Sequence, residues 1–162
     1  MKSSKISFNS IGIIHSPFKK IEGIPIQPSF AKGIKGTIKL REELVEGLID
    51  LDGFSHIILL YYFHLSKEHS FSVVPFLDDA SHGVFATRAP RRPNSIGLSV
   101  VKLLKIEKHI LYIENVDVID GTPLLDIKPY VKEFENLEDL RIGWLSEKTK
   151  KAINMKADNR FK

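Results

Sequence analysis

The chain has 162 residues, 43% hydrophobic and 27% charged, a composition typical of one folded domain rather than a disordered or fibrous protein. It contains no cysteine, which excludes disulfides and cysteine-bound zinc and suits a reducing, cytoplasmic location. The longest apolar run, residues 57–63, is too short to cross a bilayer, so we expect no membrane partner. A net charge of +4 mildly favours a polyanionic partner.

The first half of the chain alternates predicted strands with loops. Apolar and β-branched residues predict strands over 6–15, 34–40 and 55–64, and the leucine spacing predicts a short helix over 42–48. Residues 16–36 form a long loop that holds three prolines and several glycines. Long ordered loops in compact domains usually carry function, so this loop is a candidate part of a site.

The second half predicts further strands and one helix. The strands cover residues 96–107, 110–119 and 124–130, with a short edge strand over 71–77 that Pro75 restricts. Lys108 and His109 predict a tight hairpin between the two long strands, and residues 78–94 are irregular. Ser146 predicts the N-cap of a helix that runs to about Met155.

Strands that follow strands, with few helices, predict a mainly β fold. We expect a small single-domain β-barrel with short helices, its sheet antiparallel or mixed. Residues 1–135 would form the barrel. Residues 136–162 would form a C-terminal tail with a short helix, as part of the same domain.

The segment from Gly83 to Ser99 is chemically unusual. It reads GVFATRAPRRPNSIGLS, with three arginines within five residues. Pro90 and Pro93 restrict the backbone, and a stiff loop that presents guanidinium groups suits recognition of phosphate or carboxylate. From these residues alone, a solvated basic loop with local salt bridges explains the pattern equally well. We call this segment the arginine loop.

A second polar cluster runs from Asp117 to Tyr130. Asp120 and the Gly-Thr-Pro that follows it predict a turn, and an aspartate there is often only a local cap. Asp126 and Lys128 alternate along a predicted strand, so they share one face. Charged residues on that face indicate a polar cleft.

Other site types receive little support. No glycine-rich dinucleotide motif, Walker loop or nucleophile elbow is present. Asp78, Asp79 and His82 imitate part of a metal site, but no other ligand has suitable spacing, so we expect no metal. A metal-dependent hydrolase remains the more distant alternative.

Five motifs resemble those of the TsaA-like, or TrmO, family, in the family's order from about residue 8 to 131. They are IGxIxSPF at 11–18, QPS at 27–29, GFSH at 53–56, the arginine loop, and DGTPxxDIKPY at 120–130. The resemblance implies a homodimeric β-barrel that uses S-adenosylmethionine (SAM) as methyl donor and no metal. It implies an enzyme that methylates N6 of threonylcarbamoyladenosine beside the anticodon of tRNA. The alternative is a non-catalytic SAM-binding or RNA-binding module.

The resemblance also implies site residues. SAM would contact Gln27, Pro28, Ser29, His64, Leu65, Arg88, Leu98, Asp120, Gly121, Thr122 and Pro123. For the anticodon loop of tRNA, Arg91, Arg92, Lys128 and Tyr130 are candidates, because basic groups bind phosphates and tyrosine stacks on bases. An internal salt bridge is an equally good reading of Arg92. The acceptor nitrogen must lose a proton, and the sequence does not choose among Asp120, Asp126 and Tyr130 as catalytic proton acceptors.

Overall fold

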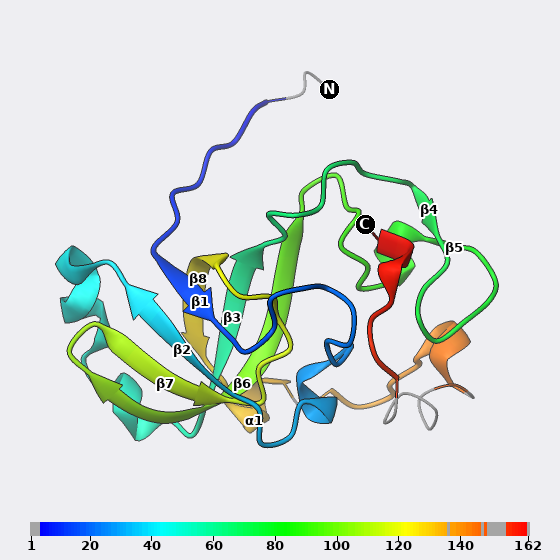
Figure 1. The fold of residues 1–162 in the computed structure, drawn as a ribbon. Coiled ribbons are helices and arrows are strands. Elements are labelled where there is room, and N and C mark those ends of the chain that lie inside the picture. The colour runs from blue at the N-terminus through cyan, green and yellow to red at the C-terminus, as the bar shows by residue number, and fades with distance from the viewer. Residues whose placement is uncertain (1–3, 136, 147, 149–154, 162) are drawn as a thin grey trace.

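The computed structural model describes residues 4–135, 137–146, 148 and 155–161, and within them six strands close into a barrel (Figure 1). The strands are β1 (Gly12–His15), β2 (Lys35–Leu40), β3 (His56–Tyr62), β6 (Ile96–Glu107), β7 (Ile110–Glu114) and β8 (Thr122–Pro129). Their order around the barrel is β1-β2-β7-β6-β3-β8, and every neighbouring pair is antiparallel. The predicted mainly β barrel is confirmed, and it is antiparallel rather than mixed.

The other elements are short. Strands β4 (Ser72–Val73) and β5 (His82–Gly83) form a separate two-stranded sheet, and α1 covers Lys132–Glu135. The 3-10 helices are η1 (Pro28–Phe30), η2 (Glu42–Leu48), η3 (Leu51–Gly53), η4 (Val84–Ala86), η5 (Gly143–Leu145) and η7 (Asn159–Phe161). The helix expected over 42–48 is therefore present as a 3-10 helix. No helix within the described ranges is long and apolar enough to cross a membrane.

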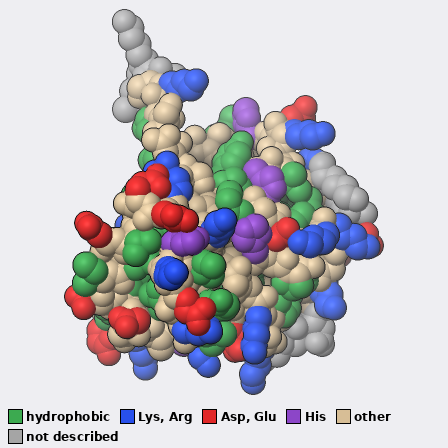
Figure 2. All heavy atoms as spheres, turned by 60° about the vertical axis from the view of Figure 1, so that its left-hand side comes forward, with side chains coloured by type: hydrophobic (Ala, Val, Ile, Leu, Met, Phe, Trp, Pro, Cys, Tyr) green, Lys and Arg blue, Asp and Glu red, His purple; other side chains and the backbone are tan. Residues whose placement is uncertain are grey.

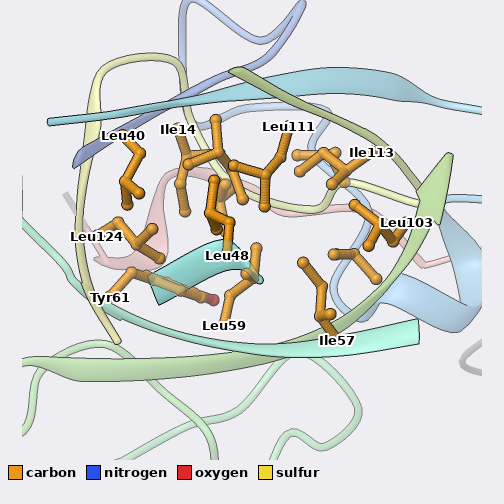
Figure 3. Close-up of a cluster of buried hydrophobic side chains, with 14 residues drawn as sticks. Ile14, Leu40, Leu48, Ile57, Leu59, Tyr61, Leu103, Leu111, Ile113 and Leu124 are labelled. Carbon is orange, nitrogen blue, oxygen red and sulfur yellow. The ribbon is translucent and has the colours of Figure 1, made fainter. Parts of the chain in front are cut away.

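The barrel interior is filled by alternate residues of the strands (Figure 3). On β3, Ile57, Leu59 and Tyr61 point inward and are almost fully buried, as the period of two in a strand requires. Ile14 and Leu124 meet them from β1 and β8. Burial of these side chains is the main stabilising contribution of the barrel.

One end of the interior is polar. On β6 the inward positions change from Leu103 and Val101 to Ser99 and Gly97 toward the start of the strand. Ser99 and Thr122 are among the few buried polar side chains of the described residues. Buried polar groups need hydrogen-bond partners or a ligand, so this end is where a site is expected.

Several strand ends differ from the sequence prediction. β7 ends at Glu114 instead of residue 119, because Asn115 takes a left-handed backbone (φ 71°) and turns the chain away from the sheet. β1 starts at Gly12 instead of residue 6, and its pairing extends only one residue further, through Ile11, whose carbonyl accepts from the Arg41 N–H and whose N–H donates to the Leu124 carbonyl. The edge strand over 71–77 is reduced to two residues before Pro75. The hairpin at Lys108 and His109 is confirmed.

The tail returns to the barrel. Lys156 forms a β-bridge with Pro25, and Phe161 packs edge-on against Phe76 with ring centroids 5.1 Å apart. In Figure 1 this C-terminal segment, coloured red, lies beside the region of β4 and β5. Most of the helix predicted from Ser146 to about residue 155 lies outside the described residues. The predicted boundary between barrel and tail stays a prediction.

The surface charge is mixed on the side shown in Figure 2. Acidic and basic side chains lie interspersed there, with histidines among them. The net charge of +4 is therefore not gathered into one basic patch on that face. This face is therefore a poor candidate for binding a polyanion. The sequence analysis favours the arginine loop instead.

Candidate ligand-binding site

A cavity of about 350 Å³ opens at the polar end of the barrel. Its wall combines the 16–34 loop, the end of β3, the arginine loop, the start of β6 and the segment after β7. Among the residues that line it are Ile24, Gln27, Tyr61, Phe63, His64, Leu65, Arg88, Leu98, Asp117, Thr122 and Phe161. Mostly apolar walls with a few convergent polar groups are typical of small-molecule sites, and this volume falls in their usual range.

Arg88 connects two of the loops across this cavity. Its Nη1 donates a hydrogen bond of 2.8 Å to Oε1 of Gln27, which precedes η1. The other guanidinium N–H groups of Arg88 donate no hydrogen bond to the described part of the chain. Arg88 and Gln27 also line a second cavity of about 530 Å³ that adjoins the first. The pair therefore stands between the two cavities.

Arg92 holds the arginine loop together. Its Nη1 donates to the backbone carbonyls of Val84 (3.1 Å) and Thr87 (2.8 Å), and its guanidinium lies 5.8 Å from the ring centre of Phe85. These contacts fasten the second half of the loop onto η4. The structure thus gives Arg92 an internal bracing contact, to backbone carbonyls rather than to an acid. Its predicted RNA contact stays a prediction.

His64 lines the cavity and has one nitrogen without a hydrogen-bond partner among the described residues. Its Nδ1 is buried and has no hydrogen-bond partner, the only such side-chain atom in the described ranges. His64 follows β3, and its ring lines the cavity. A buried nitrogen without a partner costs free energy in the folded chain.

A short chain of hydrogen bonds forms the polar wall. Ser99 Oγ donates to Asp117 Oδ1 (2.6 Å), and the Tyr61 hydroxyl lies 3.1 Å from the same Ser99 oxygen. Since Ser99 has one proton, the Tyr61 hydroxyl is the donor in the second bond. Burial raises the pKa of Asp117 to about 7, and burial also raises the pKa of Tyr61.

The sequence did not assign a role to these three residues. Asp117 belonged to the polar cluster, but the residues next to it in the sequence did not distinguish it from an aspartate that only stabilises a turn. Its placement depends on Ser99, which comes from another strand. A buried serine at an inward position of an otherwise apolar strand was the available signal.

Of the predicted SAM contacts, six line the first cavity: Gln27, His64, Leu65, Arg88, Leu98 and Thr122. Ser29 lines the second cavity. The others, Pro28, Asp120, Gly121 and Pro123, line neither cavity. Gly121 has a left-handed backbone (φ 80°) at the turn that leads into β8, which supports the turn prediction.

Asp120 fastens the turn to the strand beside it. Its carboxylate accepts hydrogen bonds from the Ser16 N–H (3.1 Å) and Lys19 Nζ (2.6 Å), and lies 3.2 Å from His15 Nδ1. Lys19 above all, with Ser16 and His15, holds the pKa of Asp120 below its usual value. These contacts fix the segment after β1 against the start of β8. Its predicted roles in SAM binding and proton transfer stay predictions.

The other predicted catalytic and RNA residues lie away from the cavity. Asp126 and Lys128 share a face of β8, as predicted, and form an ion pair of 2.7 Å. Tyr130 follows β8 and meets His56 edge-on, with ring centroids 6.5 Å apart, at the end of β3 remote from the cavity. The Arg91 carbonyl accepts the Ser70 N–H. The roles predicted for these residues, in proton transfer and RNA binding, stay predictions.

The candidate metal corner is an ion-pair cluster. Asp78 Oδ2 lies 3.0 Å from His82 Nε2 and also pairs with Lys148. These two partners hold the pKa of Asp78 well below its usual value. The His82 ring stacks on Trp144, with centroids 4.3 Å apart. In the described ranges no three His, Asp or Glu side chains are grouped so that they could hold a metal ion.

The fold is a small closed barrel with a cavity at one end. Residues 13–136 match the family model described as the tRNA-methyltransferase O N-terminal domain. The chain therefore belongs to the TrmO family, as the motifs predicted. It is 40% identical to the protein in the crystal structure of TrmO from Pseudomonas aeruginosa, with a TM-score of 0.73 over 87% of this chain and 63% of that one.

Curated relatives extend this similarity. A probable S-adenosyl-L-methionine-binding protein from Pyrococcus abyssi is 53% identical over 96% of this chain and 85% of its own length. The tRNA (adenine(37)-N6)-methyltransferase of Mus musculus is 36% identical over 88% of this chain. This chain spans only 35% of that mouse enzyme, so the similarity concerns one part of the longer protein.

Proposed function

We propose that this chain binds SAM in the cavity and transfers its methyl group to N6 of an adenosine in tRNA. The observation that carries the proposal is a mostly apolar cavity in a TrmO-family chain, with the guanidinium of Arg88 on its wall. Mostly apolar walls with a few polar groups are typical of a site for a small organic ligand.

The residues of the cavity fit the parts of SAM. Phe63, Leu65 and Leu98 offer an apolar wall for adenine. Arg88 has guanidinium donors available for the carboxylate of the amino-acid end, a pairing that is strong because both groups are charged. Bound SAM supplies a methyl group on a positively charged sulfur, a good leaving group. The protein's task is then to orient the two reactants and keep water out.

The acceptor in this proposal is N6 of threonylcarbamoyladenosine, beside the anticodon. Its nitrogen is a weak nucleophile, because its lone pair is delocalised, and it must lose a proton when it is methylated. Asp120, Asp126 and Tyr130 are the proton acceptors that the sequence offered, and none of them lines the cavity of its own chain. An arginine would hold the threonyl carboxylate.

We also propose that the working form is a homodimer. Phe85 and Leu98, at the rims of the two cavities, are 74% and 47% exposed. Exposed large hydrophobic side chains beside a site favour an interface. A second chain is also a route by which residues remote from one cavity reach the acceptor. A monomer mass in light scattering at micromolar concentration, with activity retained, would contradict this part.

The test has a binding step and a reaction step. Calorimetry with chelator-treated protein should detect SAM without added metal, and absence of binding at high micromolar SAM would overturn the proposal. The protein should then methylate tRNA that carries threonylcarbamoyladenosine, and mass spectrometry of its nucleosides should find the added methyl on N6. SAM binding without methylation would favour the alternative, a non-catalytic module, which the name of the Pyrococcus relative also fits.

A further inference from the structure

Asp117 is the one acidic side chain that lines the first cavity in the described part of the chain. The charged groups around it are arginines, since Arg88 and Arg92 line the same cavity. A cavity with two guanidinium groups repels a cation unless a carboxylate balances them. SAM carries a positive charge on its sulfur, so a negative group near that sulfur would favour its binding there.

The hydrogen bonds of Asp117 leave it available to a ligand. Ser99 donates to Oδ1, and no other side chain of the described residues donates to this carboxylate. Because Tyr61 in turn donates to Ser99, both hydroxyl protons are directed toward Asp117. The backbone N–H of Asp117 itself also interacts with the carboxylate, and Oδ2 receives no side-chain hydrogen bond from the described residues; Asp117 lines the cavity.

We propose that Asp117 is the counter-charge for the methyl donor, with its carboxylate against the sulfonium of SAM. This inference rests on the proposed function, and it adds a residue that selects the charged donor over the uncharged product. S-adenosylhomocysteine has the same adenosine, amino and carboxyl groups, but its sulfur is neutral. Affinity for the product should therefore depend much less on Asp117.

Proton release should accompany this recognition. The pKa of Asp117 is raised to about 7 by burial, against the opposing effects of Ser99 and Arg88. Tyr61, His64, Arg88 and Arg92 are the other titratable or charged groups of this cavity among the described residues. A cation beside the carboxylate lowers its pKa, so at pH 7 SAM binding should release about half a proton, and product binding close to none.

The experiment is calorimetry of SAM and S-adenosylhomocysteine at pH 7 in two buffers of different ionisation enthalpy. Three proteins are compared: the wild type, Asp117→Asn and Glu107→Gln. Asparagine keeps an acceptor for Ser99, and Glu107 is an exposed acid at the far end of the strand that holds Ser99, paired with Lys105. It controls for the loss of one negative charge.

We expect Asp117→Asn to weaken SAM binding by about tenfold or more and product binding by less than about threefold, which corresponds to one lost charge-assisted contact. Proton release should disappear in this variant and persist in Glu107→Gln. Equal weakening of both ligands would overturn the inference, because Asp117 would then bind a group that both ligands share. If Asp117→Asn fails to fold, the wild type alone decides. The inference is then overturned if SAM and S-adenosylhomocysteine release the same number of protons on binding. No SAM binding by the wild type would instead remove the proposed function itself.

Discussion

Asp117 and Asp120 belong to one short segment, and their surroundings give them opposite properties. Asp120 is paired with Lys19, His15 and a backbone N–H at the seam between β1 and β8, and these partners lower its pKa. Asp117 is buried at the cavity wall with Ser99 as its partner, and burial raises its pKa. Pairing stabilises the charged form of the first acid, while burial penalises that of the second.

This difference separates an acid that holds the fold from one suited to a ligand. A carboxylate that is fully paired has little capacity left for a substrate, whereas an underpaired one beside a cavity is a functional candidate. Such a group costs stability in the empty protein, and proteins retain that cost at sites where a ligand compensates it.

The largest stability effect should come from Gly97→Ala. A Cβ atom at Gly97 would collide with the Tyr61 ring, and that ring belongs to the hydrogen-bonded chain that ends at Asp117. Overpacking of this kind costs about 3 kcal/mol of unfolding free energy. Urea unfolding measures it. An unchanged unfolding free energy would show that Tyr61 can move aside, and that the polar wall is looser than described.

Asp120→Ala should cost about 2 kcal/mol at pH 7, because it removes an acceptor shared by Ser16, Lys19 and His15. The folded-state pKa of Asp120 is lowered, so its stabilisation is present above the ordinary aspartate pKa. The difference between variant and wild type should therefore shrink as the pH falls below about 4. Urea unfolding at pH 7 and at acid pH measures both values. A difference that does not change with pH would contradict the paired state of Asp120.

Asp117→Asn should act in the opposite direction and raise stability by about 1 kcal/mol at pH 8. The folded-state pKa of Asp117 is raised, so the ionised carboxylate destabilises the protein above its pKa of about 7. The gain should fall as the pH is lowered from about 7 and should disappear below about 4, where the carboxyl becomes protonated in both states. Melting temperatures over this pH range measure it. A variant less stable than the wild type at pH 8 would mean that Asp117 holds the fold, as Asp120 does.

The same contrast explains what the sequence could predict. The continuous apolar run of β3 and the apolar, β-branched residues of β6 predicted barrel strands, because residue type is a local property. The end of β7 at Asn115 and the start of β1 at Gly12 depend on a left-handed residue and on a partner strand, which local patterns do not encode. Boundaries were therefore less accurate than the existence of the strands.

The site residues also divide into those that sequence motifs reveal and those that depend on contacts between distant segments. The family motifs led to Gln27, His64 and Arg88, which the structure brings to one cavity. The motifs drew attention to Asp120 rather than Asp117, because a turn motif is visible in the sequence and the pairing of β6 with the segment after β7 is not. The bracing of Arg92 by backbone carbonyls was equally invisible, since any carbonyl can accept.

The central claim is that SAM binds in the cavity whose wall contains Arg88, and a titration of the protein with SAM tests it most directly. SAM affinity is measured by calorimetry for the wild type, for Arg88→Ala and for Arg41→Ala, an exposed arginine paired with Glu43 outside the cavity. We expect binding to the wild type, about tenfold weaker binding to Arg88→Ala, and no change in Arg41→Ala, since one charge-assisted hydrogen bond is lost only in the first variant. Equal SAM affinity in all three proteins would contradict the claim.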